Sequence, residues 1–250
     1  MTDALDFWAP FRSATQARVG LGRAGDALPT QAKLALRSAH AVARDAVHLP
    51  WDVDALEHGV AGVGAEVRRV RSRAVDRATY LRRPDLGRQP ESLDGVPAAP
   101  AGTFDVALVL ADGLSAAAHD QHGVPLVEAV LTRLREAGLS IAPIVLAEQA
   151  RVGLGDPVGA HLGATAVIVV VGERPGLSVA DSLGAYVTHL PRPGRRDSER
   201  NCVSNIRAPH GLGYDRAASI LLGLVLGARE LGESGVRLKE RSSAPGAELG

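Results

Sequence analysis

Several features that would place a protein in a familiar class are scarce in this sequence of 250 residues. Cys202 is the only cysteine, so no disulfide can form within the chain. The formal net charge is zero at pH 7, so no overall field attracts nucleic acid or an anionic membrane. The longest nearly apolar run covers residues 217–228, well short of the ~20 residues that span a bilayer. We therefore expect neither a nucleic-acid-binding nor a membrane-spanning protein.

Lysine is almost absent as well, since only Lys33 and Lys239 occur and Arg carries nearly all the positive charge. Both lysines lie near the chain ends, so a Schiff-base lysine is not expected. Residues 1–10 contain Asp3 and Asp6 and no basic segment, so we expect no signal peptide. With a single cysteine, this makes the cytoplasm the expected location.

Residues 1–83 are expected to form a helical N-terminal region that docks a partner. Thr30 can cap a helix that follows Pro29 and that Pro50 ends. Apolar positions then predict a second helix over about 54–77. Pro and Gly residues crowd segment 84–103, which predicts a linker or a wrapping loop.

Residues 104–240 alternate between short apolar runs and segments of helix length. Nearly continuous Val, Ile and Leu indicates strands buried on both faces, as in a parallel sheet. The alternation predicts an α/β domain with a Rossmann-like, doubly wound, mostly parallel sheet. A flexible tail is expected at 241–250. We expect strands at 104–111, 141–147, 164–171 and 202–206, and helices near 115–121, 126–137 and 215–231.

Two motifs resemble cofactor sites but lack the right context. Residues 20–25 read GLGRAG and match GxGxxG, yet no apolar strand precedes them and Pro29 interrupts the helix that should follow. We favour a loop whose glycines allow close approach to another subunit. Residues 120–125 read DQHGVP and resemble DxHxxG, in which a histidine ligates cobalamin cobalt, but Pro125 replaces the last glycine. We favour a solvated His122 at a helix C-terminus.

Two groups of basic side chains also stand out. His40, Arg44 and His48 recur every four residues and share one helix stripe. Because Arg44 would repel a metal cation between the imidazoles, we favour a polar interface stripe, with solvated surface as the alternative. A second group, the basic patch, lacks the aromatic platforms of nucleic-acid sites and indicates a solvated or subunit-facing helix. It consists of Arg68, Arg69, Arg71, Arg73, Arg77, Arg82 and Arg83.

Carboxylates follow three of the predicted strands, at Asp112, Glu148 and Glu173. Ligands of open α/β sheets bind beyond the carboxyl ends of the strands, so these acids indicate a pocket there. Each acid also has a structural alternative: Asp112 could cap a helix, and the two glutamates could pair with neighbouring Arg. No nucleophile elbow, base–nucleophile pair or metal-ligand spacing is evident. We therefore predict no catalytic residue and no metal ligand in this chain.

Four stretches carry a family resemblance: TQARVGLGRAGDALPT at 15–30, FDVALVLADGLS at 104–115, IAPIVLAEQARVGLGD at 141–156 and GERPGLSVADSLGAYVTHLPRPGRRDSERNCVSNIR at 172–207. They are similar to the small subunit, or light chain, of ethanolamine ammonia-lyase. The GERPGLS and RNCVSNIR segments are the most specific, and the likeness covers most of residues 10–240.

The resemblance implies a subunit, inactive alone, of an enzyme that converts ethanolamine to acetaldehyde and ammonia. Adenosylcobalamin supplies the radical when its cobalt–carbon bond breaks homolytically. The large subunit, a TIM barrel, is expected to hold the substrate, and several large–small pairs are expected to assemble. The small subunit covers the cofactor at the interface, through contacts that correspond here to Val152, Glu173 and Cys202.

These three residues have different expected roles. Glu173 would accept hydrogen bonds from the amide rim of the corrin, and Val152 would add backbone and apolar contacts. Cys202 would let the corrin edge approach closely and would not act as a nucleophile. A non-catalytic cobalamin carrier or scaffold is one alternative, and a nucleotide-dependent oxidoreductase using residues 20–25 is another. The resemblance also leaves a bacterial microcompartment open as the location.

Overall fold

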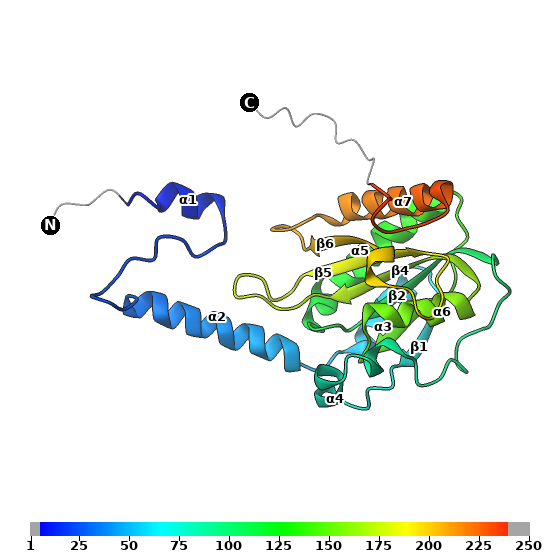
Figure 1. The fold of residues 1–250 in the computed structure, drawn as a ribbon, viewed down its shortest axis with the longest axis horizontal. Coiled ribbons are helices and arrows are strands. Elements are labelled where there is room, and N and C mark those ends of the chain that lie inside the picture. Colours follow the sequence, from blue (N-terminus) through cyan, green and yellow to red (C-terminus); the bar gives the residue numbers. More distant parts are fainter. Residues whose placement is uncertain (1–5, 240–250) are drawn as a thin grey trace, which may run out of the picture.

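The computed structural model describes residues 6–239 and contains one six-stranded mixed sheet (Figure 1). The strand order is β1-β3-β2-β4-β5-β6, in which the first four strands are parallel and β5 and β6 run antiparallel to their neighbours. The predicted α/β class and mostly parallel sheet are confirmed. The strands are β1 Val67–Arg71, β2 Phe104–Ala111, β3 Ile144–Glu148, β4 Ala164–Gly172, β5 Leu183–His189 and β6 Asn201–Ile206.

Helices cover both faces of the sheet (Figure 1). Leu108 and Val109 are adjacent on β2 and both fully buried, but they belong to the cores on opposite faces. The nearly continuous apolar runs are thus explained by burial on two sides. One face is covered by α3 (Val53–Gly62), α5 (Ala117–Glu136) and α7 (Tyr214–Leu231), and the other by α6 (Gly155–His161).

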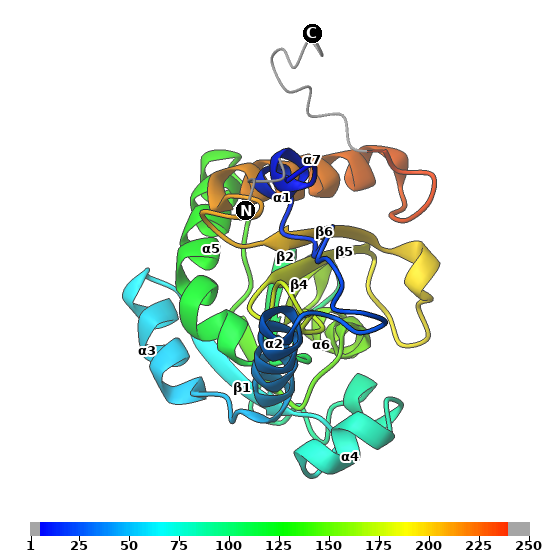
Figure 2. The same cartoon turned by 90° about the vertical axis from the view of Figure 1, so that its left-hand side faces the viewer.

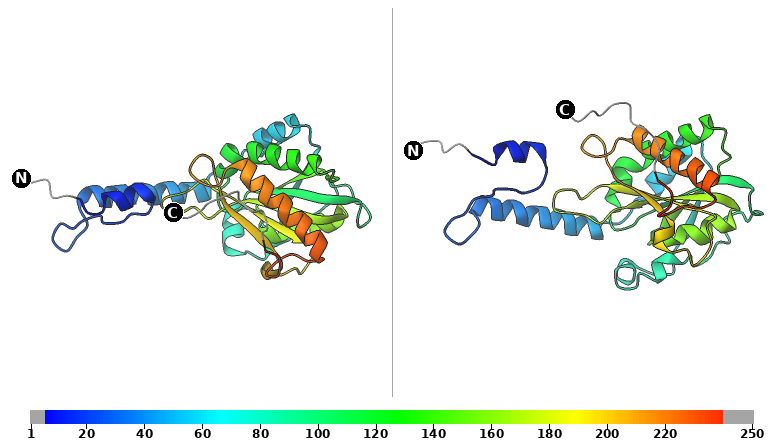
Figure 3. Two further views of the ribbon diagram at one scale, coloured as in Figure 1. Left: turned by 90° about the horizontal axis from the view of Figure 1, so that it is seen from above. Right: turned by 45° about the horizontal axis from the view of Figure 1, so that its top comes forward.

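The N-terminal segment extends away from the sheet as an arm (Figures 1 and 3). It contains α1 (Ala9–Ala14) and α2 (Thr30–His48), which Figure 2 views nearly end-on. The helix predicted between two prolines is confirmed, although Pro29 occupies the cap position and no side chain caps it. Ala46 is the only buried residue of α2, so this helix contributes little to the core.

The predicted helix over 54–77 is wrong in its second half. The helix α3 ends at Gly62, Gly64 follows with a φ of +75°, and the chain then forms β1 and the short α4 (Arg77–Arg82). β1 lies at the sheet edge, where charged side chains reach water, so its VRRVR sequence lacks the apolar continuity of an inner strand.

Two further expectations differ from the structure. The helices predicted near 115–121 and 126–137 are one helix, α5, which continues through Pro125. β5 was not predicted, because Gly184 and polar residues interrupt its apolar pattern. Within residues 6–239, the 3-10 turns are η1 Leu86–Arg88, the sole regular element of 84–103, η2 Val152–Leu154 and η3 Asp197–Glu199. The tail predicted at 241–250 lies outside the described residues.

Candidate functional site

A cavity of about 310 Å³ lies at the carboxyl ends of β2 and β4, where the position of the acids predicted a pocket. Tyr80 of α4, Val152 of η2, Glu173 after β4 and Tyr186 of β5 are among its lining residues. The structure therefore brings two of the three predicted contacts, Val152 and Glu173, into one cavity. They come from segments that meet only because β3 and β4 flank β2 in the sheet.

Glu173 is held at one of its two carboxylate oxygens. Its Oε2 accepts a hydrogen bond from Ser182 Oγ at 2.6 Å and another from the backbone N–H of Asn205 at 3.2 Å. Its Oε1 has no hydrogen-bond partner in the described part of the chain. The expected alternative, an ion pair with a neighbouring Arg, is not formed within residues 6–239. Glu173 is thus anchored at Oε2 and keeps acceptor capacity at Oε1.

Val152 begins a 3-10 turn next to Arg151, one of two arginines whose guanidinium groups lie over the ring of Tyr80. The guanidinium of Arg151 lies 4.4 Å from the centre of the Tyr80 ring, and that of Arg77 lies 4.7 Å from it. Arg151 Nη2 also donates to the Tyr80 carbonyl at 3.0 Å. Burial raises the pKa of Tyr80 to about 12, so its hydroxyl stays protonated at neutral pH. These contacts hold one wall of the cavity.

Cys202 lies next to the cavity and is connected to it through Tyr186. The two residues pair directly across β5 and β6. Cys202 is exposed as a residue, but loss of water around its sulfur raises the thiol pKa. Tyr186 lowers this pKa and Glu173 raises it, each to a smaller extent. The thiol is therefore protonated at neutral pH, in agreement with a binding rather than a nucleophilic role.

Asp112 directly precedes Gly113, which lines the cavity. Its side chain is buried and accepts the backbone N–H groups of Gly113 at 3.0 Å, Gln149 at 2.9 Å and Ala150 at 2.8 Å. Burial raises its pKa to about 6, against the opposing effects of these donors and of Arg77. The expected helix cap is wrong, because α5 begins several residues later without a side-chain cap. Asp112 instead ties the end of β2 to the loop after β3.

The remaining sequence candidates lie elsewhere. Glu148 pairs with Arg71 at 3.9 Å, the structural alternative expected for it. His122 lies in the middle of α5 and its side chain is buried, with Nδ1 2.8 Å from Tyr214 Oη. The expectation of a solvated histidine at a helix end is therefore wrong. The glycine motif at 20–25 follows α1 and packs Gly20 against Trp8.

The two basic groups also separate. The stripe of His40, Arg44 and His48 is exposed on α2 as expected, and an interface role for it stays a prediction. The basic patch is not on one helix, because its first three members lie on β1 and only Arg77 and Arg82 lie on a helix, α4. Acids neutralise part of it: Arg69, for example, pairs with Asp54 at 2.5 Å and also with Glu57.

Tyr80, Arg151 and Tyr186 are cavity residues that the sequence did not reveal. Tyr186 lies on the strand that was not predicted, and Tyr80 precedes the cavity loops by a long stretch of chain. Every residue of 183–189 is buried except Tyr186, which is half-buried, so no alternation of apolar and polar positions marks Tyr186 as a cavity residue. Their position depends on the tertiary fold.

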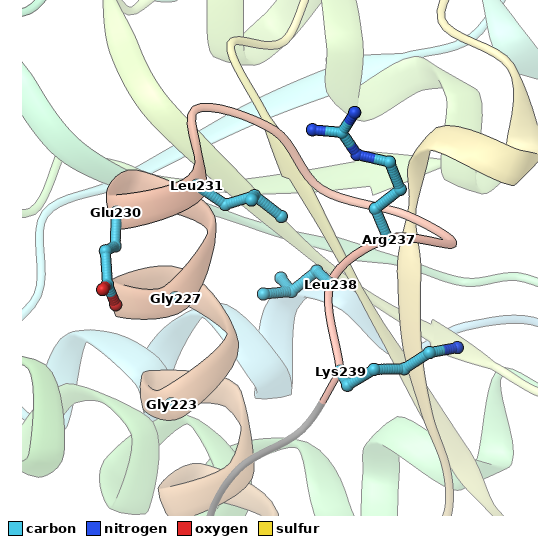
Figure 4. Close-up of a pocket in the computed structure, with 7 residues that line it drawn as sticks. All are labelled: Gly223, Gly227, Glu230, Leu231, Arg237, Leu238 and Lys239. Atoms are coloured by element: carbon cyan, nitrogen blue, oxygen red, sulfur yellow. The ribbon is translucent and has the colours of Figure 1, made fainter.

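Two of the other hollows in the described part of the chain are larger than this cavity. A groove of about 670 Å³ runs between α2 and the loop 176–181, which joins β4 to β5. A hollow of about 460 Å³ lies between α7 and residues 237–239, where Leu231 and Leu238 point toward one another (Figure 4). That hollow lies toward the opposite end of the strands. Nearby Ser234 accepts a hydrogen bond from the backbone N–H of His189, which ends β5 and pairs with Ala166 near the start of β4.

Neither a metal site nor a membrane span is found among the described residues. No group of three or more His, Cys, Asp or Glu within residues 6–239 is arranged to hold a metal ion. No helix in that part of the chain is long and apolar enough to cross a bilayer.

Comparison with known proteins identifies the family. The family model described as ethanolamine ammonia-lyase light chain (EutC) matches residues 5–239. The chain is 54% identical to the ethanolamine ammonia-lyase small subunit of Rhodococcus erythropolis, over 96% of this chain and 92% of the relative. Identity to the small subunit of Ralstonia nicotianae is 50%, over 97% and 92% of the two chains. The protein thus belongs to the ethanolamine ammonia-lyase light-chain family and is a subunit of a carbon–nitrogen lyase.

Proposed function

We propose that this chain binds one edge of adenosylcobalamin at the strand-end cavity and that the large subunit encloses the rest. The observation that carries the proposal is the meeting of Val152 and Glu173 in one open cavity, with Cys202 beside it. A volume of about 310 Å³ is enough for side chains of a corrin rim but not for the whole macrocycle. This supports a clamp that needs a second chain.

The side chains around the cavity fit the chemistry of a corrin edge. That edge bears amide groups, whose N–H donors suit the unbonded Oε1 of Glu173. An ionised acceptor makes these bonds stronger than neutral ones. Val152 offers apolar surface, and the protonated thiol of Cys202 permits close approach without reacting. When bound, the cofactor supplies the radical that removes ammonia from ethanolamine to give acetaldehyde, while this chain binds and orients it.

The N-terminal arm is our candidate for docking the large subunit. Phe7, Trp8 and Phe11 form an exposed aromatic cluster, with Phe7 69% exposed, and α2 exposes Leu34 and Val42. Aromatic side chains are enriched at protein interfaces, so an uncovered cluster of this kind supports a docking role. Assembly of several large–small pairs, and a cytoplasmic location with or without a microcompartment, are proposals that rest on the family.

The test is a titration of adenosylcobalamin into the complex of this chain with its large subunit. Replacing Glu173 by Ala removes a charged acceptor, so the binding free energy should weaken by about 1–3 kcal/mol. The apparent Kd should then rise roughly 5- to 150-fold. Glu148→Ala is the matched control, because that carboxylate also lies at the carboxyl end of a strand but pairs with Arg71 instead. We expect its Kd to match the wild type.

Three results would contradict this account. An unchanged Kd for Glu173→Ala would remove that carboxylate from the cofactor site. Tight cobalamin binding by this chain alone would favour an independent carrier over a clamp. Ammonia release from ethanolamine by this chain without the large subunit would contradict its being inactive alone.

A further inference from the structure

Buried carboxylates hold both ends of the Val152 loop, residues 149–154, which connects β3 to α6. At the start, Asp112 accepts the N–H groups of the first two loop residues at 2.9 and 2.8 Å. Beyond the end, Asp156 accepts a bidentate pair of hydrogen bonds from Arg200, each 2.7 Å long. The side chains of this second pair are 3% and 2% exposed, so water does not compete with their contact.

Arg200 has a contact for each of its five N–H groups. Besides the two bonds to Asp156, Nη1 donates to Thr188 Oγ1 at 2.8 Å and Nη2 donates to the Arg195 carbonyl at 3.1 Å. Its Nε donates to Asp197 Oδ1 at 3.4 Å. Because a guanidinium is planar and rigid, these contacts fix the angle at which α6, β5 and the start of β6 meet.

The pair joins two segments that carry predicted cofactor contacts. Arg200 directly precedes β6, which carries Cys202, and Asp156 lies in the first turn of the helix that follows Val152. Neither side chain lines the cavity itself. We propose that the Asp156–Arg200 pair is a positioning device that sets the separation between the Val152 loop and β6. The inference rests on the proposed cofactor site, because it assumes that both segments touch the cofactor.

A purely structural role would leave a different signature. Replacing a buried ion pair by apolar residues of similar size is often neutral for stability, because the cost of desolvating two charges disappears with their attraction. An apolar replacement would, however, lose the five directed contacts that fix the geometry. In a double variant with apolar residues, cofactor affinity should therefore fall while the free energy of unfolding stays the same. If the pair had only a structural role, the substitution would change both quantities or neither.

The experiment compares the double variant Asp156→Leu with Arg200→Met against wild type in the assembled complex. We expect the apparent Kd for adenosylcobalamin to rise roughly 10- to 100-fold, as for displacements on the order of 1 Å at other preorganised sites. The kcat at saturating cofactor should be unchanged. Backbone amides of the Val152 loop and of β6 in the free chain should exchange hydrogen faster. The matched control is Glu136→Leu with Arg133→Met, an exposed pair on α5 that should behave as wild type.

The single variant Arg200→Lys is a second test that does not depend on the double variant folding. It keeps the charge but loses the fork, so the Kd should rise less than in the double variant and kcat should again be retained. If Glu173→Ala weakens cofactor binding but both of these variants bind normally, the inference is overturned and the proposed site stands. If Glu173→Ala also binds normally, the proposed site fails and the inference fails with it.

Discussion

At the scale of single residues, the site depends on carboxylates that accept hydrogen bonds from the backbone of other segments. Asp112 gathers three N–H groups from two loops, and Glu173 joins the end of β4 to β5 and β6. Sequence position indicated that both acids follow strands. It could not show which partners they bind, because those partners lie far away in the chain.

His119 gives a testable pH dependence at this scale. Its Nε2 donates to the Ala111 carbonyl at 2.7 Å, and complete burial lowers its pKa to about 4, from the usual value near 6.5. The unfolded chain therefore binds more protons between these values, so stability is complete above about pH 6.5 and is lost as the pH falls toward 4. From pH 7 to pH 5 this group should cost about 2 kcal/mol.

The variant His119→Gln keeps a donor near the Nε2 position but does not titrate. Urea unfolding at pH 7 and pH 5 should show a smaller loss of stability in this variant than in wild type. Asp112, whose folded pKa is raised to about 6, favours the folded state at lower pH in both proteins, so it cancels in the comparison. Equal pH dependence in the two proteins would mean that His119 is not a neutral buried group.

At the scale of elements, strand ends approach each other so closely that only glycine fits. Gly113 has a φ of +62°, and a Cβ there would lie 2.3 Å from the Gly172 carbonyl and 2.4 Å from Val171 Cγ2. The ends of β2 and β4 can therefore lie this close together beside the cavity only because residue 113 has no side chain. The apolar pattern predicted both strands, but the need for a glycine between them appears only in three dimensions.

Replacing Gly113 by Ala should therefore push the two strand ends apart. We expect the free energy of unfolding to fall by roughly 1–3 kcal/mol and the cofactor Kd of the complex to rise. Gly138→Ala is the control, because Gly138 has a φ of +70° with no atom within 4 Å of the added Cβ. The control measures backbone strain alone and should leave the Kd unchanged. An equal effect of the two substitutions on stability and Kd would contradict the close-contact account.

Whether an element could be predicted depended on how completely the sheet buries it. Buried parallel strands such as β2 and β4 are apolar on both faces, and their sequences show it. The edge strand β1 is charged and resembles a helix surface, and β5 contains a glycine. The helix α5 was divided in the prediction at Pro125, which tertiary packing of Leu126 and Leu131 overrides.

At the scale of the whole molecule, the chain consists of a sheet covered by helices and an N-terminal arm that extends away from it (Figure 3). The strand-end cavity is a second feature that nothing in the described part of the chain covers. The family resemblance indicated the cofactor contacts, and the fold places Val152 and Glu173 in the same cavity. A subunit that holds one edge of a cofactor needs both an open site and a surface for its partner. The sequence alone could not show the shape of either.

Hydrogen exchange of the complex with its large subunit, with and without adenosylcobalamin, tests the central claim most directly. We predict that cofactor binding slows amide exchange in the Val152 loop, in residues 172–176 and in β6, while β1 at the other sheet edge is unchanged. Protection at the three segments would support a shared corrin-binding edge. Unchanged exchange there, in a complex shown to hold the cofactor, would contradict it.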